Sequence, residues 1–340
     1  MSYQPQFSIS STLLNHVESI TSLREKIQGA SIDLSWIPAL QKDTRTRNVH
    51  ASTSIEGNPL TFEEVKALEE GQEIPTPTPR SKREVTNYFA GLRYVGKKAT
   101  LKTIRHDHLL ELHRILAGGD VMDQGEAGAY RTINVRVGEH FPPAHQDVSP
   151  QMFELLTWWN EKAPSLSPIL SSAILHYRFE DIHPFADGNG RTGRALALWE
   201  LYRRGFDTHH IFSIDEYYWE DRPAYYRALG QVREAGEDLS QWLEYSAQGL
   251  ESTLQRFWKR VQALQQKAKN KLLLTPRQEE VLTLLKTQGP QSPVQLWEAL
   301  NLSKQGTLNV PSPLLEAGLI EKIGTKKSGK YLLTEPAGNA

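Results

Sequence analysis

The chain has 340 residues, with 39 Lys and Arg against 40 Asp and Glu and a formal net charge of -1. This balance excludes a chain-wide attraction to nucleic acid or acidic partners, and the length suggests two or three domains. Cysteine is absent, which excludes disulfides, zinc–thiolate sites and thiol nucleophiles. The N-terminus has no basic stretch followed by an apolar run, and no apolar run is long enough to span a membrane, so we expect a cytoplasmic protein without a membrane span.

Helical spacing of apolar residues dominates the chain before residue 210. One helix is expected to open at the capping box Thr61-Phe62-Glu63-Glu64. Others are expected over 109–117, 167–177 and 195–205, each with Gly, Ser or Pro at one end. Three histidines within 106–113 do not share one helix face, so we expect surface or core roles for them and not a metal site.

One segment has strand spacing instead. Ile133, Val135 and Val137 alternate with polar residues, and Gly138 and a Phe-Pro-Pro turn follow. In a mostly helical chain this pattern predicts a lone β-hairpin, which needs packing against helices for stability.

The C-terminal part of the chain reads as a separate unit. An amphipathic stripe over 254–264 leads into it, and capping boxes at Thr275 and Ser292 open two helices. A third segment ends at Gly318, and residues 320–333 have the pattern of two short strands around glycines. The order helix, helix, helix, hairpin resembles a winged helix.

This C-terminal unit is mildly basic. Over 267–335 it carries ten Lys and Arg against six Glu, a net charge of +4. A winged helix usually reads DNA with its third helix, but Pro311 and Pro313 stand in that segment, and proline inside a helix costs about 3 kcal/mol or more. A protein-docking or dimerising module is therefore the favoured alternative to DNA binding, and the sequence leaves a homodimer open.

The segment with the richest chemistry is His183-Pro184-Phe185-Ala186-Asp187-Gly188-Asn189-Gly190-Arg191-Thr192-Gly193-Arg194. Its glycines let backbone N–H groups approach phosphate oxygens, and its arginines offer forked donors to them. Asp187 suits a magnesium ion that also binds substrate phosphates, and His183 can take a proton near neutral pH. Because the segment joins two expected helices, the start of the second adds an anion-attracting N-terminus. Together these features predict a polyphosphate site.

Two other interpretations of this segment are weaker. Residues 188–193 also fit the G-x-G-x-x-G dinucleotide fingerprint, but that fingerprint needs a preceding buried strand in a βαβ unit. Here the preceding residues carry charges and Pro184. A structural loop without chemistry is the other alternative, although this whole set would be an odd way to cap a helix.

The twelve residues resemble the signature of the Fic-domain family, H-P-F-x-D/E-G-N-G-R-x-x-R, and match it at every fixed position. The resemblance implies a mainly α fold, a Fic-type helical bundle with a β-hairpin flap, here joined to the small winged-helix-like domain. It implies transfer of AMP from ATP to hydroxyl side chains of target proteins and of the chain itself. ATP and Mg²⁺ are then the expected cofactors, and the expected partner is a protein with an exposed hydroxyl.

The same resemblance assigns roles within the signature. His183 would be the general base, Asp187 would hold Mg²⁺, and Arg194 would bind the γ-phosphate. The expected nucleotide contacts are Glu56, Gly188, Asn189, Gly190, Arg191, Thr192, Gly193, Arg194, Tyr225 and Tyr226. Related Doc-type phosphotransferases carry a lysine at the place of Gly190, so glycine there favours nucleotidyl over phosphoryl transfer. Transfer of a cytidyl, uridyl or phosphocholine group stays open, because the signature does not read the base.

A short upstream motif resembles the family's inhibitory helix, S/T-x-x-x-E-G/N, with Ser52, Glu56 and Gly57 at its fixed positions. Taken alone, it reads as an ordinary helix end closed by Gly57. Together with the signature, it implies that Glu56 pairs with Arg194 and occupies the guanidinium meant for the γ-phosphate. A charge-assisted hydrogen bond of this kind is worth about 1.5–3 kcal/mol. Glu56 is also a candidate for positioning water in the reverse reaction.

Residues 130–141 resemble the family's flap, where a target segment adds as a strand; the alternative is a plain surface hairpin. The flap residues expected over the nucleotide and target are Val137, Gly138, Glu139 and His140. Tyr225 and Tyr226 resemble the adenine-side helix, with helical core as the alternative. Arg233 stands where relatives often carry asparagine, which leaves the adenine contact open.

We therefore expect three parts in the chain. Residues 1–100 form a helical N-terminal region with the inhibitory motif, 101–250 form the Fic catalytic core, and 268–335 form the winged-helix-like domain.

Overall fold

The computed structural model describes residues 3–30, 36–75, 78–207, 210–269, 275–300, 309–316, 319–324 and 329–334. The chain divides into two compact units, Met1–Gln262 and Ala263–Ala340. The finer division expected near residues 100 and 250 stays a prediction. Within the described ranges, no helix is long and apolar enough to cross a membrane.

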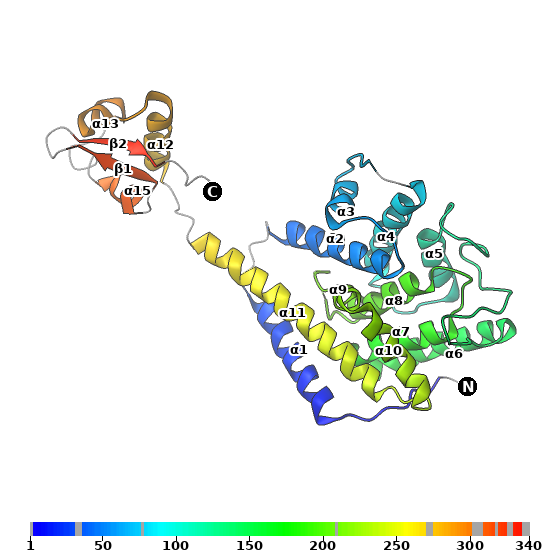
Figure 1. The fold of residues 1–340 in the computed structure, drawn as a ribbon. Coiled ribbons are helices and arrows are strands. Elements are labelled where there is room, and N and C mark those ends of the chain that lie inside the picture. The colour runs from blue at the N-terminus through cyan, green and yellow to red at the C-terminus, as the bar shows by residue number, and fades with distance from the viewer. Residues whose placement is uncertain are drawn as a thin grey trace. The chain divides into compact units, whose positions relative to one another are not determined.

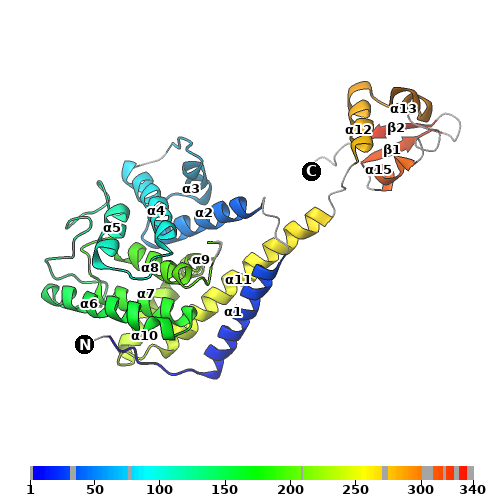
Figure 2. The ribbon, with the colours of Figure 1, turned by 180° about the vertical axis from the view of Figure 1, so that it is seen from behind.

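The first unit is helical. Its elements are α1 (Ser11–Gly29), α2 (Ile37–Ile55), α3 (Phe62–Glu69), α4 (Pro79–Lys98), α5 (His106–Leu116), α6 (His145–Glu161), the 3-10 turn η1 (Ala163–Ser165), α7 (Pro168–Ile182), α8 (Asn189–Arg203), α9 (Asp215–Glu220), α10 (Arg222–Glu234) and α11 (Ser240–Lys269), which continues past residue 262. The four helices expected from spacing and capping are confirmed as α3, α5, α7 and α8. Helix α1 lies along α11 (Figures 1 and 2), where His16 and Ser19 both contact the Glu251 carboxylate at 2.6 Å.

Helices α7 and α8 form the buried centre of this unit. Helix α7 starts at the Ser167 cap with Pro168 in the first turn, and nearly all its residues are buried. Glu200 of α8 is fully buried and accepts hydrogen bonds from Ser171 Oγ at 2.7 Å and Trp159 Nε1 at 2.6 Å. A buried carboxylate needs such partners, and these bonds pin α6, α7 and α8 together. These contacts lie at the ends of α7 and α8 away from their connecting loop, so they fix the pair of helices from which the loop projects.

The expected hairpin is reduced to its turn. Among the described residues of this segment, the ladder is a single bridge between Val137 and His140, closed by hydrogen bonds of 3.0 and 2.9 Å. No strand forms over 132–137, which corrects the strand expectation. The polar groups of this segment bond elsewhere: Asn134 Oδ1 accepts from the His145 N–H, and the Ile133 carbonyl accepts from Arg131. The alternation of apolar and polar residues fits a strand, but a strand also needs a second strand to pair with.

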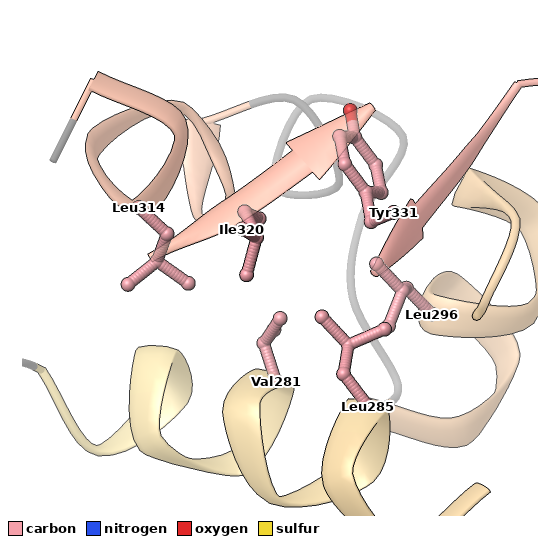
Figure 3. Packing of buried hydrophobic residues seen from close by; sticks show 6 residues of the cluster. All are labelled: Val281, Leu285, Leu296, Leu314, Ile320 and Tyr331. Atoms are coloured by element: carbon pink, nitrogen blue, oxygen red, sulfur yellow. The ribbon is translucent and has the colours of Figure 1, made fainter. Parts of the chain in front are cut away.

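The second unit has its own core. Its described elements are α12 (Pro276–Gln288), α13 (Pro293–Leu300), α15 (Ser312–Glu316) and the antiparallel strands β1 (Ile320–Ile323) and β2 (Lys330–Leu333). Figure 3 shows side chains from all five elements meeting in one apolar cluster: Val281, Leu285, Leu296, Leu314, Ile320 and Tyr331. The capping boxes at Thr275 and Ser292 and the two strands are confirmed. The expected end at Gly318 lies outside the described residues, and the winged-helix assignment stays a prediction.

Candidate active site

The signature, residues 183–194, forms the loop between α7 and α8 and the first turns of α8. His183 is the C-cap of α7, with φ 49° and ψ 61°, and its N–H donates to the Phe179 carbonyl at 2.9 Å. Gly188 caps the start of α8 at φ 77°. A left-handed backbone is uncommon for a non-glycine residue and is often found at functional sites. It turns the chain sharply, so that the His183 side chain and the first turn of α8 face one cavity.

Hydrogen bonds inside the loop use several signature side chains. Asn189 Oδ1 accepts from the Phe185 N–H, and Asn189 Nδ2 donates to the Phe185 carbonyl, both at 2.8 Å. Thr192 Oγ1 donates to the Gly188 carbonyl at 2.8 Å and is fully buried. These side chains hold the loop in shape, and their expected nucleotide contacts stay predictions. Gly193 packs against Glu180, where a Cβ would collide with the carboxylate.

His113 of α5 supports the loop from below. Its ring lies parallel to Phe185 at 3.6 Å between centroids. Its Nδ1 accepts from the Gly128 N–H at 2.9 Å, so Nε2 donates to the Asp187 carbonyl, also 2.9 Å away. Burial lowers the pKa of His113 to about 4, which keeps the ring neutral. The sequence predicted only a surface or core role, because nothing in the local pattern shows which distant loop a core histidine holds.

Arg131 joins the flap segment, residues 130–141, to the loop between α7 and α8, residues 183–188, which we call the catalytic loop after its predicted role. The sequence pattern did not single out Arg131. Its guanidinium donates to the carbonyls of His183, Ile133 and Pro143 at 2.9, 2.9 and 2.5 Å, and at 3.4 Å to that of Ile182. The side chain is buried, and in the described part of the chain it pairs with no carboxylate. Arg131 therefore acts as a clamp made of charge-assisted bonds to backbone oxygens.

The imidazole of His183 is held in its neutral form. Burial lowers its pKa to about 4, although a hydrogen bond to the Glu180 backbone carbonyl opposes this. A neutral imidazole that donates on one side keeps its other nitrogen free to accept a proton. The side chain is 17% exposed, so a ligand in the cavity can reach it.

Arg194 and Glu56 meet across the cavity. Arg194 Nη2 donates to Glu56 Oε1 at 2.7 Å, and the same guanidinium donates to Ser52 Oγ at 2.7 Å and to the Ser52 carbonyl at 2.9 Å. Burial alone would raise the pKa of Glu56, but Arg194, helped by Arg191 and Arg222, holds it below its ordinary value. Glu56 follows the last turn of α2, and Gly57 at φ 91° ends that helix. A carboxylate thus occupies a guanidinium at the start of α8.

Two cavities flank this ion pair. One, of about 460 Å³, is lined by the predicted base, Arg194, Gly190, the flap turn and α10. The other, of about 540 Å³, is polar and is lined by Asp187, Arg191 and Glu56 among others. Arg191 is buried, and among the described residues its Nε and Nη1 have no hydrogen-bond partner. Buried cationic donors without partners fit an anionic ligand that reaches from one cavity into the other.

The remaining predicted residues line the 460 Å³ cavity, although they differ in how far they are exposed. Tyr225 and Tyr226 both line the 460 Å³ cavity: Tyr226 is 42% exposed, and Tyr225 is buried, with its hydroxyl 3.1 Å from His176 Nε2. The flap residues that line the same cavity are Val137, Gly138, Glu139 and His140. Arg233 also lines it and donates to Asp181 Oδ1 at 3.3 Å.

Asp187 fits a divalent ion only in part. Its side chain is 31% exposed, and its Oδ1 accepts from the Gly188 N–H at 2.5 Å. Within the described ranges, no group of three or more His, Cys, Asp or Glu side chains could hold a metal by itself. Mg²⁺ binds through one or two carboxylates plus phosphates and water, so one carboxylate beside a phosphate cavity fits it.

Together, the fold and the site define a helical protein with a loop that leads into a helix and carries arginines suited to an anion. The carboxylate of Glu56 pairs with one of these arginines, Arg194. The Fic/DOC family model matches residues 103–201. Protein adenylyltransferase fic-1 of Caenorhabditis elegans is 32% identical over 277 residues, 78% of this chain and 49% of that protein. Protein adenylyltransferase Fic of Nematostella vectensis is 33% identical over 247 residues, 71% of this chain and 55% of that protein.

Solved structures agree with this match. A Fic family protein from Desulfovibrio desulfuricans G20 superposes with a TM-score of 0.72 at 26% identity, covering 99% of this chain and 100% of that one. A variant of Fic-1 from C. elegans gives 0.61 at 30% identity over 72% of each chain. The chain therefore belongs to the Fic family. It spans about half the length of the curated relatives it matches.

Proposed function

We propose that this protein transfers AMP from ATP to hydroxyl side chains of target proteins and of itself. The observation that carries the proposal is the single cavity lined by a neutral His183, Arg194, Gly190 and the flap turn, with a carboxylate paired to the guanidinium that a phosphate would use. The similar curated proteins are named protein adenylyltransferases, which supports the same reaction.

In the proposed reaction, the target hydroxyl oxygen attacks the α-phosphorus of ATP while the free nitrogen of His183 takes its proton. A new O–P bond forms, and the bond between the α-phosphorus and pyrophosphate breaks. Such a base contributes about 10²- to 10⁴-fold. Backbone N–H groups at the start of α8, together with Arg191 and Arg194, hold the phosphates and the charge that develops on them. Asp187 would hold Mg²⁺, which neutralises phosphate charge when bound.

Glu56 is the proposed inhibitor of this reaction. It occupies Arg194 at 2.7 Å, and a γ-phosphate must displace it to use the same guanidinium. Losing a charge-assisted hydrogen bond of about 1.5–3 kcal/mol misplaces the triphosphate and lowers transfer. Because Glu56 lines both cavities, it also stands where it can position water for removal of AMP from the target.

Gly190 supports nucleotidyl transfer. A Cβ at this position would collide with Glu56 and lie 3.1 Å from Arg194 Nη1, so a longer side chain would fill the phosphate end of the cavity. ATP is the proposed nucleotide. Tyr226 and Leu229 of α10 offer apolar surface to the base without a polar group that selects one base.

Label transfer tests the reaction. The chain with Glu56→Gly is incubated with Mg²⁺ and ATP labelled on the α-phosphate, and label on protein is counted. We expect at least about tenfold more self-labelling than in the unaltered chain, the factor that corresponds to about 1.4 kcal/mol. Addition of His183→Ala should remove the label. Labelling from ATP labelled only on the γ-phosphate would show phosphoryl transfer and contradict the proposal.

For the second unit we propose docking to protein, either a target or a second copy, in a cytoplasmic setting. Its net charge of +4 over 267–335 is small, and Pro311 and Pro313 flank the start of the short α15. A gel shift with DNA at low salt separates protein docking from DNA binding by this unit. A salt-dependent shift of DNA by the full chain would contradict docking as its sole role.

A further inference from the structure

One carboxyl group in the cavity has no part in the proposed reaction. Glu180 lies on α7 one turn before His183, is 8% exposed and lines the 460 Å³ cavity. Its Oε2 lies 3.9 Å from His183 Nδ1, and its Oε1 lies 3.9 Å from His176 Nε2. Neither distance is a hydrogen bond. Gly193 leaves room for the carboxyl, because a Cβ there would collide with Oε1.

One oxygen of the Glu180 carboxyl lacks a hydrogen bond within the described part of the chain. This oxygen, Oε1, is buried. Burying a polar group without a partner is unfavourable, so a buried carboxyl that lines a cavity points to a ligand that completes its bonding. Three other polar groups of the cavity wall have protein partners: Arg233 binds Asp181, Glu56 binds Arg194, and the Tyr225 hydroxyl contacts His176.

The position of Glu180 identifies the part of the ligand it meets. The phosphate end of the cavity is set by Arg194 and the first turn of α8, and the base end by Tyr226 and Leu229 of α10. Glu180 lines the same cavity and lies 3.9 Å from both His183 and His176, and His176 contacts Tyr225 of α10, the helix at the base end. In a nucleoside triphosphate, the group that joins phosphates to base is the sugar.

We infer that Glu180 hydrogen-bonds a ribose hydroxyl of the bound nucleotide and makes the cavity favour ribonucleotides over deoxyribonucleotides. This inference rests on the proposed function. A site built to bond a substrate hydroxyl rejects the analogue without it, because the buried polar group of the site is then left unpaired. Burial raises the pKa of Glu180 to about 8, although Arg194 opposes the rise. The carboxyl therefore keeps its proton at neutral pH, can donate or accept, and does not repel the phosphates.

Equilibrium binding tests the inference without requiring transfer. The full chain with Glu56→Gly and His183→Ala, which frees Arg194 and blocks the reaction, is titrated calorimetrically with ATP, 2′-deoxy-ATP and 3′-deoxy-ATP. We expect at least one deoxynucleotide to bind about tenfold more weakly than ATP, which corresponds to about 1.4 kcal/mol. Addition of Glu180→Ala should make the three affinities equal.

Two further variants separate a sugar contact from a structural role. Glu180→Gln keeps a donor and an acceptor in the same shape and should keep the preference. Tyr226→Ala removes an exposed ring at the base end of the cavity and should weaken the binding of all three nucleotides by the same factor. Equal affinities in the parent chain, or a preference that survives Glu180→Ala, would overturn the inference and leave the proposed reaction standing. A clear preference in this binding test, together with no label transfer by the Glu56→Gly chain that keeps His183, would support the sugar contact and overturn the reaction instead.

Discussion

The catalytic loop and the flap segment line the same cavity but are held in different ways. The loop lies between two buried helices; the Asn189 side chain bonds within it, and its Asp187 carbonyl accepts a hydrogen bond from His113. The flap is closed by one bridge, and it exposes Ile133, Val137 and Phe141, the last at 71%. Arg131 is the strongest link between the two regions.

This difference shows how one cavity can serve two needs. Charge stabilisation of a phosphate works best with donors fixed in advance, so a rigid loop suits the chemistry. A protein target presents a larger and more variable surface, and a loosely tied segment with exposed apolar side chains can adapt to it. Substitutions should therefore act on chemistry in the loop, on stability at the clamp and on target recognition in the flap.

The largest effect is expected at His183. In the Glu56→Gly chain, His183→Ala should lower the rate of label transfer by about 10²- to 10⁴-fold, because no other group takes the proton of the hydroxyl. The midpoint of thermal unfolding should stay close to that of the parent, since the side chain lies at the cavity wall. A rate within threefold of the parent would remove His183 from the role of base.

Arg131 tests the link between loop and flap. Arg131→Ala removes four charge-assisted bonds to backbone carbonyls and should lower the free energy of unfolding by about 3 kcal/mol. Denaturant unfolding measures this change. Arg136→Ala is the matched control in the same segment: Arg136 is exposed, bonds Gly138 and lies over Phe141, so its loss should stay within about 0.5 kcal/mol. Equal effects of the two substitutions would refute the clamp.

Acid should loosen the loop through His113. Its folded pKa of about 4 lies below the ordinary value of 6.5, so the unfolded chain binds the proton first as the pH falls. The stability it contributes is complete above pH 6.5 and is lost between about 6.5 and 4, by up to about 1.4 kcal/mol per pH unit. Unfolding free energies of the parent and of His113→Gln across this window measure it. An equally steep fall in the variant would exclude His113 as a source.

The smallest effect on stability is expected in the flap. Phe141→Ser changes an exposed side chain and should shift the free energy of unfolding by no more than about 0.5 kcal/mol. If target segments dock on this segment, the same change should raise the KM for the protein target and leave the KM for ATP unchanged. A raised KM for ATP instead would place Phe141 in the nucleotide site.

The sequence predicted the catalytic loop better than the distant residues that bind it, Arg131 and His113. Twelve adjacent residues carry the signature, so its place at the junction of two helices followed from the local pattern. The Glu56 motif led to an expected pairing with Arg194, and the structure places the two side chains 2.7 Å apart; whether the pair inhibits stays a prediction.

The rest depends on contacts between distant residues. Arg131 and His113 bind backbone groups 52 and 74 positions away, and no local spacing reveals such partners. Asn189 and Thr192 matched the signature, but only the folded loop shows that their side chains bond within it. Strand alternation over 132–137 predicted pairing that the segment cannot complete without a second strand.

The most direct test of the central claim is the intact mass of the full chain after incubation with ATP and Mg²⁺. The account predicts that the Glu56→Gly chain gains the mass of AMP, that the unaltered chain gains much less, and that the chain with both Glu56→Gly and His183→Ala gains none. An AMP adduct that is undiminished in the double variant, or a chain that stays unmodified in all three forms while ATP binds, would contradict it.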